Sequence, residues 1–292
     1  MICDLCPRRC HAERTENTGA GRCRMGLNPR IARAALHMWE EPCISGERGS
    51  GAVFFSGCNL GCIFCQNYAL SHGGEGVDIT PERLAGIFAE LEAQGAHNIN
   101  LVNPTHFVPA LIKALSIYRP SIPVVYNCGG YESVDTLRAL EGQVDVYLPD
   151  FKYIDADAAR VYSDAANYPQ ICEAALTEMC RQTGRPVYGA DGVMLRGTLV
   201  RHLVLPGLTG HSMRLLNWIK EHLPEGTPVS LMGQYTPYGE AEKYPGMNRK
   251  LSKKEYALVL AHMRVIGLED GYAQEVSAAS RAFIPPFDGT GV

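Results

Sequence analysis

Three cysteines stand close together in the 292-residue chain: Cys58, Cys62 and Cys65, spaced CxxxCxxC. They follow the apolar run 52–55, which predicts a loop that begins where a strand ends. Structural zinc usually takes four nitrogen or sulfur ligands, and an ordinary [4Fe-4S] cluster takes four cysteines. Three thiolates on one loop can instead hold three irons of such a cluster and leave the fourth iron open to a small chelating ligand.

Two other interpretations of this triplet are weaker. Buried free cysteines are common singly, but three crowded onto a Gly-containing loop are poor core material. A zinc knuckle would need a fourth ligand close by, and His72 is the only near candidate. The spacing therefore favours an iron–sulfur cluster and a redox enzyme.

A second group of cysteines with short spacings lies near the N-terminus: Cys3, Cys6, Cys10 and Cys23. Four such ligands suit either zinc or a second iron–sulfur cluster, and the spacing does not separate the two. Cys43 or His11 would serve in place of one of them. We expect a small Cys-rich, metal-binding extension over residues 1–50.

From residue 51 onward, short apolar runs alternate with longer helical patterns, as in parallel βα units. We expect strands at 51–56, 97–102, 122–126, 144–148, 198–205 and 228–231. We expect helices at 80–94, 106–118, 132–140, 156–182, 212–223 and 252–266, the first with Thr80 as its N-cap. Six such units predict an α/β fold, a partial (β/α)6 TIM barrel with a Cys-rich N-terminal extension. The barrel would span residues 51–267, and residues 268–292 would form a C-terminal tail.

The charge, the apolar runs and the cysteine content of the chain limit its possible partners and location. The net charge of −4 and the absence of a basic run argue against nucleic acid as a partner. No segment reaches the roughly 18 uninterrupted apolar residues of a membrane span, so we expect a cytoplasmic protein without a membrane partner. Eleven cysteines in such a chain favour metal ligation over disulfides, because the cytosol keeps thiols reduced.

The triplet, with Phe64 just before its last cysteine, resembles the signature of the radical S-adenosylmethionine (SAM) superfamily. The resemblance covers most of residues 51–266. It implies a [4Fe-4S] cluster on the three cysteines and SAM chelated to the open iron. Reductive cleavage of SAM would then give a 5′-deoxyadenosyl radical that abstracts a hydrogen atom from the substrate. The later segments are similar to the glycyl-radical-enzyme activases, especially the PflX-type relatives of pyruvate formate-lyase activating enzyme.

The resemblance to the activases implies several cofactor contacts near the strand ends. Asn67, two residues after Cys65, matches the Cys-x-Asn of the activases, although a turn amide is an equally good interpretation. The activases bind the SAM amino group with a Gly-Gly-Glu motif after the second strand, and no carboxylate stands there in this chain. Asn103 and Thr105 offer oxygen acceptors instead, although Thr105 can also cap the next helix. Gln234 takes the place of an activase histidine near the SAM carboxylate.

Three further strand ends carry implied contacts. Asn127 lies in a segment similar to one that lines SAM in the activases. Asp150 and Lys152 resemble the activases' Asp-Leu-Lys, whose acid and lysine lie by the SAM carboxylate and ribose; a structural ion pair is the alternative. Two positions apart, they would face the same side of the strand. Because adjacent strand residues face opposite ways, either Arg201 or His202 must point into the barrel, and Arg201 is our candidate cofactor contact.

The resemblance implies a radical SAM enzyme that abstracts a hydrogen atom, with glycyl-radical installation on a partner protein as its most typical form. Modification of a peptide or a small metabolite is the alternative. A non-catalytic iron–sulfur electron carrier or scaffold is a minor alternative. We assign no catalytic side chain, and we expect a flavodoxin or ferredoxin as the reductant.

Overall fold

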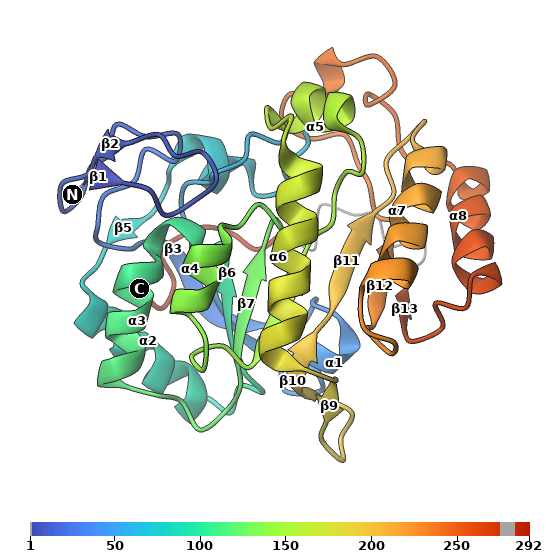
Figure 1. Ribbon diagram of the computed structural model, residues 1–292. Helices are drawn as coiled ribbons and strands as arrows, with labels where there is room; N and C mark the ends of the chain where they lie inside the picture. Colours follow the sequence, from blue (N-terminus) through green and yellow to red (C-terminus); the bar gives the residue numbers. More distant parts are fainter. Residues whose placement is uncertain (1, 275–283) are drawn as a thin grey trace.

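The computed structural model describes residues 2–274 and 284–292, with a large curved sheet at its centre (Figure 1). Eight strands lie in the order β5-β3-β4-β6-β7-β8-β10-β9, and three more form the sheet β11-β12-β13. Their bounds are β3 (Arg30–His37), β4 (Ser50–Phe55), β5 (Val77–Asp78), β6 (Ile99–Val102), β7 (Val124–Cys128), β8 (Val146–Pro149), β9 (Val187–Tyr188), β10 (Met194–Thr198), β11 (Val200–Leu203), β12 (Val229–Met232) and β13 (Gly271–Ala273). Two short strands, β1 (Ile2–Cys3) and β2 (Ala12–Glu13), pair antiparallel near the N-terminus.

All six predicted strands are present, and their neighbours pair in parallel. The strand predicted at 198–205 is divided into β10 and β11, which pair with different partners. β10 pairs with β8, whereas β11 pairs with β12, and Phe151 N donates to Arg201 O where the two sheets meet. The curved parallel sheet confirms the predicted partial TIM barrel with its Cys-rich N-terminus.

The helices follow the strands as expected. They are α1 (Pro42–Ser45), α2 (Pro81–Ala93), α3 (Val108–Ile117), α4 (Val134–Ala139), α5 (Ala156–Ser163), α6 (Tyr168–Thr183), α7 (Thr209–His222) and α8 (Lys253–Val265), with single turns at Ala69–Gly73, Thr105–Phe107 and Ala241–Lys243. Thr80 caps α2, since its side chain accepts a hydrogen bond from Arg83 N. The single helix predicted at 156–182 is wrong. The chain turns at Asp164, whose left-handed φ of 52° ends α5 before α6 begins.

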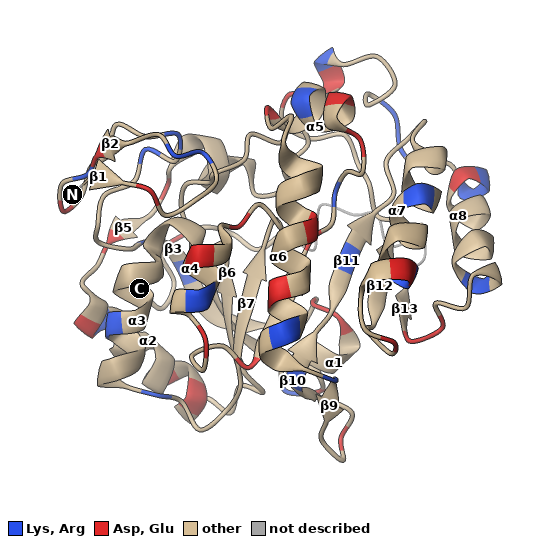
Figure 2. Cartoon of the chain, in the orientation of Figure 1, with Lys and Arg blue, Asp and Glu red and all other residues tan. Residues whose placement is uncertain are grey.

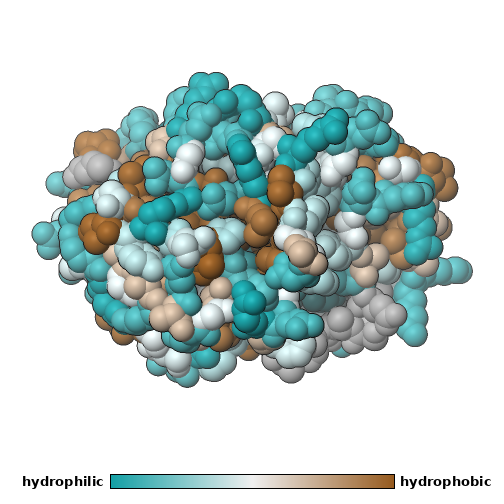
Figure 3. All heavy atoms as spheres, turned by 90° about the horizontal axis from the view of Figure 1, so that it is seen from below, coloured by the Kyte–Doolittle hydropathy of each residue, from teal (hydrophilic) through white to brown (hydrophobic). Residues whose placement is uncertain are grey.

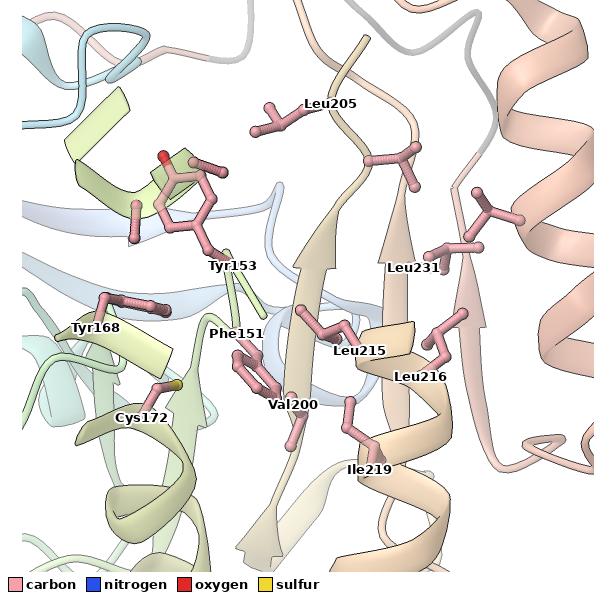
Figure 4. Packing of buried hydrophobic residues seen from close by; sticks show 14 of the residues in the cluster. Phe151, Tyr153, Tyr168, Cys172, Val200, Leu205, Leu215, Leu216, Ile219 and Leu231 are labelled. Atoms are coloured by element: carbon pink, nitrogen blue, oxygen red, sulfur yellow. The ribbon is translucent and has the colours of Figure 1, made fainter. Parts of the chain in front are cut away.

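Strand alternation separates the outside of the barrel from its inside. On β6 and β7, Ile99, Leu101, Val124 and Tyr126 pack outward in the apolar layer that includes residues of α2, α3 and α6. A second outward layer joins α6 and α7 to the end of β8 and to β11 and β12, and Figure 4 shows part of it. The side chains at alternate positions, such as Asn100, therefore face the interior.

Two segments outside the predicted barrel range extend its sheets. β3 lies within residues 1–50 yet pairs antiparallel with β4, and β13 lies within 268–292 yet pairs in parallel with β12. The division into extension, barrel and tail stays a prediction, because pairing across a boundary does not show which parts fold alone.

The surface carries charges of both signs. Both basic and acidic residues occur on each of α6, α7 and α8 (Figure 2). Seen from below, apolar residues lie in small groups among polar ones (Figure 3). Within the described ranges, no helix combines the length and apolarity needed to cross a membrane.

Candidate active site

The cysteine triplet lies on the loop that leaves β4, as predicted, and the N-terminal segment packs directly against its start. Gly57, just before Cys58, has a φ of +80°, which favours glycine. A Cβ at this position would lie 2.8 Å from Cys23 O and 2.5 Å from Met25 Cγ. Gly57 therefore permits the close approach of the N-terminal segment to the triplet loop.

Each cysteine of the triplet has a hydrogen-bond donor from the surrounding fold. The pairs are Leu60 N to Cys58 Sγ at 3.3 Å, Ser163 Oγ to Cys62 Sγ at 2.9 Å, and the Ser71 side chain to Cys65. Such donors stabilise the thiolate form and tune the electronics of a bound cluster. Sequence reasoning missed Ser71 and Ser163, and nothing in their local sequence marks them, because only the fold brings α5 beside the triplet.

The donor chemistry of the triplet fits an iron–sulfur cluster. Burial raises the pKa of Cys58 to about 12 and that of Cys65 to about 11, and charge repulsion from neighbouring cysteines adds to both shifts. The positive charge of bound iron ions would offset that repulsion and stabilise the thiolates, since a metal-bound thiol is deprotonated. In the part of the chain that the structure describes, no three Cys, His, Asp or Glu side chains stand close enough to hold a metal ion as they are. A [4Fe-4S] cluster binds each thiolate through a different iron, so it does not require the three sulfurs to converge on one ion.

Four of the predicted contacts come together at the ends of β7 and β8 and near the start of β11. Asp150 accepts from Arg201 Nε at 2.8 Å and from Lys152 Nζ at 2.5 Å, and Arg201 Nη2 donates to Asn127 Oδ1 at 2.6 Å. Burial raises the pKa of Asp150, but Arg201 and Lys152 outweigh it and leave the carboxyl below its usual range. Lys152 also lies near enough to Cys65 to lower that thiol's pKa. This arrangement links the triplet electrostatically to the barrel interior.

Tyr168 of α6 holds the chain that carries this acid and lysine. Its hydroxyl donates to Asp150 O at 2.7 Å and accepts from Lys152 N at 2.9 Å. Figure 4 shows Tyr168 and Cys172 of α6 lying near Phe151. The backbone between the two charged residues is therefore fixed from outside the barrel.

Arg201 rather than His202 points inward. His202 faces the opposite side, where Nδ1 lies 2.7 Å from Phe151 O and Nε2 lies 2.8 Å from Ser212 Oγ. Burial lowers the pKa of His202 to about 4, so this histidine is neutral at pH 7. Both nitrogens have partners, which makes His202 a structural residue.

Sequence reasoning missed two acidic residues of the site, Glu40 and Glu41. Glu40 Oε2 accepts from Arg201 Nη1 at 3.1 Å, and its Oε1 accepts from Asn127 Nδ2 at 3.3 Å and Asn100 Nδ2 at 3.2 Å. Glu41 Oε2 lies 3.9 Å from Arg201 Nη1. The available signal was the Glu-Glu-Pro sequence just before Cys43, in a range that was assigned to the extension.

The remaining predicted contacts lie apart from this group. Thr105 is buried and donates to Glu132 Oε1 at 2.8 Å. Asn103 lies beside the triplet, where its side chain donates to Gly57 O at 3.1 Å and lowers the pKa of Cys58. The backbone N–H of Asn67 donates to Cys65, and Gln234 Nε2 lies 4.0 Å from Met232 Sδ.

The four N-terminal cysteines also lie near one another. Burial raises the pKa of Cys6 to about 12 and also raises that of Cys23, and both thiols are further shifted by neighbouring cysteines of the group, Cys3 and Cys10 among them. Of the two replacement ligands, Cys43 packs at the lower end of the barrel with Ile44 and Leu148. His11 is exposed and lies 3.3 Å from Asp4 Oδ1.

Arginine side chains join the N-terminal segment to the barrel, and a pocket lies between residues 20–24 of this segment and the triplet loop. Arg8 Nε donates to Asn59 O at 2.7 Å, and Arg14 Nη1 donates to His106 O at 2.7 Å. The pocket measures about 420 Å³, a size that suits a small-molecule ligand. It is lined by Ala20, Gly21, Arg22, Arg24, Cys58, Leu60, Ser71 and His72.

The profile of the radical SAM superfamily matches residues 52–219, which is more than half of the chain. The chain belongs to the radical SAM superfamily. It is therefore an enzyme, and membership implies a [4Fe-4S] cluster and SAM as its cofactors. The minor alternative, a non-catalytic electron carrier or scaffold, is therefore wrong.

Individual proteins are similar to this chain in sequence or in fold. An uncharacterized protein of Methanocaldococcus jannaschii is 29% identical over 265 residues, which cover 87% of this chain and 71% of that protein. Two structures of Streptococcus suis SuiB, one bound to SAM and one to the precursor peptide SuiA, superpose with TM-scores of 0.53 and 0.52. Both align over 75% of this chain at 9% and 10% identity, so the likeness concerns the fold alone. This chain spans about half the length of SuiB, 48% and 46% in the two structures.

Proposed function

We propose that Cys58, Cys62 and Cys65 hold the [4Fe-4S] cluster of this radical SAM enzyme and that SAM binds beside them. When bound, the cluster and SAM supply a one-electron reductive cleavage that releases a 5′-deoxyadenosyl radical for hydrogen-atom abstraction. The single observation that carries this assignment is the position of the triplet, on the loop that leaves the first parallel strand of the matched domain. Asp150, Lys152, Arg201 and Asn127, gathered at neighbouring strand ends, are the proposed SAM contacts.

The role of this chain's own residues is to position SAM. Lys152 brings a positive charge toward the triplet, and Asp150 and Arg201 hold that lysine in place. Ser163, Ser71 and Asn103 donate to the sulfurs or lie against them, which supports the anionic thiolates. Asn67 and Gln234 are weaker proposals, and so is Thr105, whose hydroxyl already donates to Glu132.

For the reaction, we propose hydrogen-atom abstraction of the kind that glycyl-radical-enzyme activases of the PflX type perform, with a flavodoxin or ferredoxin as reductant. The support is the order of the strand-end segments. A second candidate is modification of a peptide or a small metabolite. The observation that favours it is the charged group around Glu40 and Arg201, which offers a small polar ligand directional contacts inside the barrel.

We also propose that Cys3, Cys6, Cys10 and Cys23 hold a second iron–sulfur cluster or a zinc ion. The support is the mutual proximity of these cysteines and the short spacing between them. Anaerobic reconstitution followed by iron, sulfide and zinc analysis of the wild type and of Cys6→Ala separates the two metals.

The test of the function is the assay for 5′-deoxyadenosine after anaerobic reconstitution with iron and sulfide, with dithionite and SAM added. Product from the wild type and none from Cys62→Ala is the expected result. A fully loaded, reduced cluster that neither binds nor cleaves SAM would overturn the proposal. A co-expressed partner that gains a glycyl radical signal would favour the activase reaction over turnover of a free metabolite.

A further inference from the structure

Glu41 is a buried carboxylate whose hydrogen bonds the fold leaves incomplete. Its side chain is 2% exposed, and Oε2 has no hydrogen-bond partner among the described residues. Its neighbour Glu40 differs, since both of its oxygens accept hydrogen bonds from Asn100, Asn127 or Arg201. A buried charge without a partner is costly, so the two acids need separate explanations.

Two further polar atoms of this region are buried and unpartnered. They are Asn100 Oδ1 on β6 and Ser230 Oγ on β12, and both residues are 0% exposed. Asn100 contacts Glu40 through its amide nitrogen. Burial raises the pKa of Glu41, and the charge of Arg201 and the nearby Ser230 hydroxyl act against that rise. The atoms without a partner are thus two acceptors, Glu41 Oε2 and Asn100 Oδ1, and the Ser230 hydroxyl, which can also accept. A ligand that donates hydrogen bonds would complement them.

The charge balance of the region points to the sign of that donor. Three carboxylates, those of Glu40, Glu41 and Asp150, share two cations, Arg201 and Lys152. Arg201 is already used by Asp150, Glu40 and Asn127, and Lys152 lies toward the triplet. Burial raises the pKa of both Glu40 and Glu41, which favours their neutral forms, and one more positive charge beside Glu41 would instead favour its carboxylate.

The fold holds the two acids rigidly in this place. They lie between β3 and α1, where Glu40 N donates to Ser45 Oγ at 3.0 Å and Ile44 N donates to Glu41 O at 2.8 Å. Asn98 Nδ2 in turn donates to Ile44 O at 2.7 Å, which ties the turn to the start of β6. Such anchoring is typical of a preorganised binding group.

We propose that Glu41, with Ser230 and Asn100, binds the ammonium or guanidinium group of the substrate, while Glu40 positions Arg201. This inference rests on the proposed function and deepens it, because it names the substrate as a cationic compound or a peptide with a basic group. The residues that link Glu41 to the triplet, namely Glu40, Arg201 and Asp150, are each 11–18% exposed and lie on the expected route of a ligand from the triplet side. SAM also carries an ammonium group, so the test measures both ligands.

The experiment is a binding titration of the anaerobically reconstituted full chain, without reductant, by calorimetry or saturation-transfer NMR. The probes are n-butylammonium and agmatine, with n-butanol as the neutral control and SAM in a separate titration. The variants are Glu41→Gln and Ser230→Ala. Glu47→Gln is the matched control, because it removes a charge from an exposed position of the same β3–β4 connection.

The expected result is that wild type and Glu47→Gln bind both cations and not n-butanol. Glu41→Gln weakens cation binding at least tenfold and Ser230→Ala weakens it several-fold, while SAM binding and the melting temperature stay near wild type. If Glu41→Gln loses SAM binding but keeps cation binding, the substrate assignment is overturned, because the Glu41 carboxylate then binds SAM. Cation binding that is absent in the wild type or equal in all variants would overturn the site. A wild type that binds cations but never cleaves SAM would instead contradict the proposed function.

Discussion

The two cysteine groups differ in what holds them in place. The triplet lies on a loop that leaves the central sheet, and its sulfurs receive hydrogen bonds from α5 and from the turn at Ala69–Gly73. The N-terminal group lies in a segment whose regular structure amounts to two strands of two residues each, β1 and β2. The first group uses a scaffold that the barrel supplies, whereas the second depends on arginine contacts and, we propose, on its own metal.

The proposed metal sites would give one type of ligand two purposes in one chain. A metal on a preformed loop mainly adds reactivity, while a metal in a segment with little secondary structure also contributes folding free energy. The predictions below test that distinction, from the largest expected effect to the smallest.

The largest effect is expected for Cys62→Ala. We expect formation of 5′-deoxyadenosine to fall to background, because one of the three proposed cluster ligands is lost, while circular dichroism and the melting temperature stay close to wild type. Cys6→Ala should retain SAM cleavage at a reduced rate. Equal loss of product in the two variants would contradict the division of roles between the groups.

Metal removal should affect the N-terminal segment before it affects the barrel. After treatment with a chelator under reducing conditions, we expect limited proteolysis to cut within residues 2–28 while residues 50–270 stay protected. The physical reason is that the segment buries little apolar surface of its own. Mass spectrometry of the fragments gives the measurement, and cutting that begins in the barrel would refute the contrast.

The pH dependence of stability tests the contact between the N-terminal segment and the barrel. Glu132 of the barrel lies at this contact, near Cys6. Burial raises the pKa of Glu132 to about 7, against the hydrogen bonds from Thr105 and Tyr126, which lower it. The native state therefore holds this proton more tightly than the unfolded state. Its stabilisation is complete below about pH 4.5 and is lost as the pH rises through about 7, a change of about 3 kcal/mol.

Glu132→Gln is the matched variant for this measurement. It keeps an acceptor for the Thr105 hydroxyl and cannot ionise. We expect the difference in unfolding free energy between variant and wild type, measured in urea from pH 4.5 to 8, to grow with pH. A difference that does not change with pH would show that Glu132 titrates normally.

The smallest expected effect is that of Arg8→Met, which removes the contacts of this one side chain with the triplet loop and with the end of α5. Arg8 donates to Asn59 O at 2.7 Å and to Asp164 O at 2.5 Å. Charged hydrogen bonds of this kind predict a loss of about 2 kcal/mol or less in the docking of the segment, since Arg8 is partly exposed. Hydrogen exchange of the N-terminal amides gives the measurement, with Arg9→Met as the exposed control. Unchanged hydrogen exchange would show that the remaining contacts, such as those of Arg14 and the packing at Gly57, are enough to hold the N-terminal segment against the barrel.

The sequence alone predicted the six barrel strands, the triplet at the end of the first of them, and the cofactor class. It succeeded because period-two and helical patterns report burial, and because the spacing of cysteines within one loop is a local property. The same logic placed Asp150 and Lys152 on one side of a strand end and required either Arg201 or His202 to face inward. Only the fold showed which of the last two does so.

Tertiary structure decided the rest, for a physical reason that particular residues illustrate. Glu40 and Glu41 precede the barrel in sequence, yet the pairing of β3 with β4 brings them beside Arg201. Ser163 reaches Cys62 only because Asp164 ends α5 at that point, and Thr105 turns toward Glu132 instead of the cofactor site. Local sequence determines which residues can form a strand, a loop or a ligand set. Contacts between distant segments depend on how strands pair and helices end, and these decide which charges meet inside the barrel.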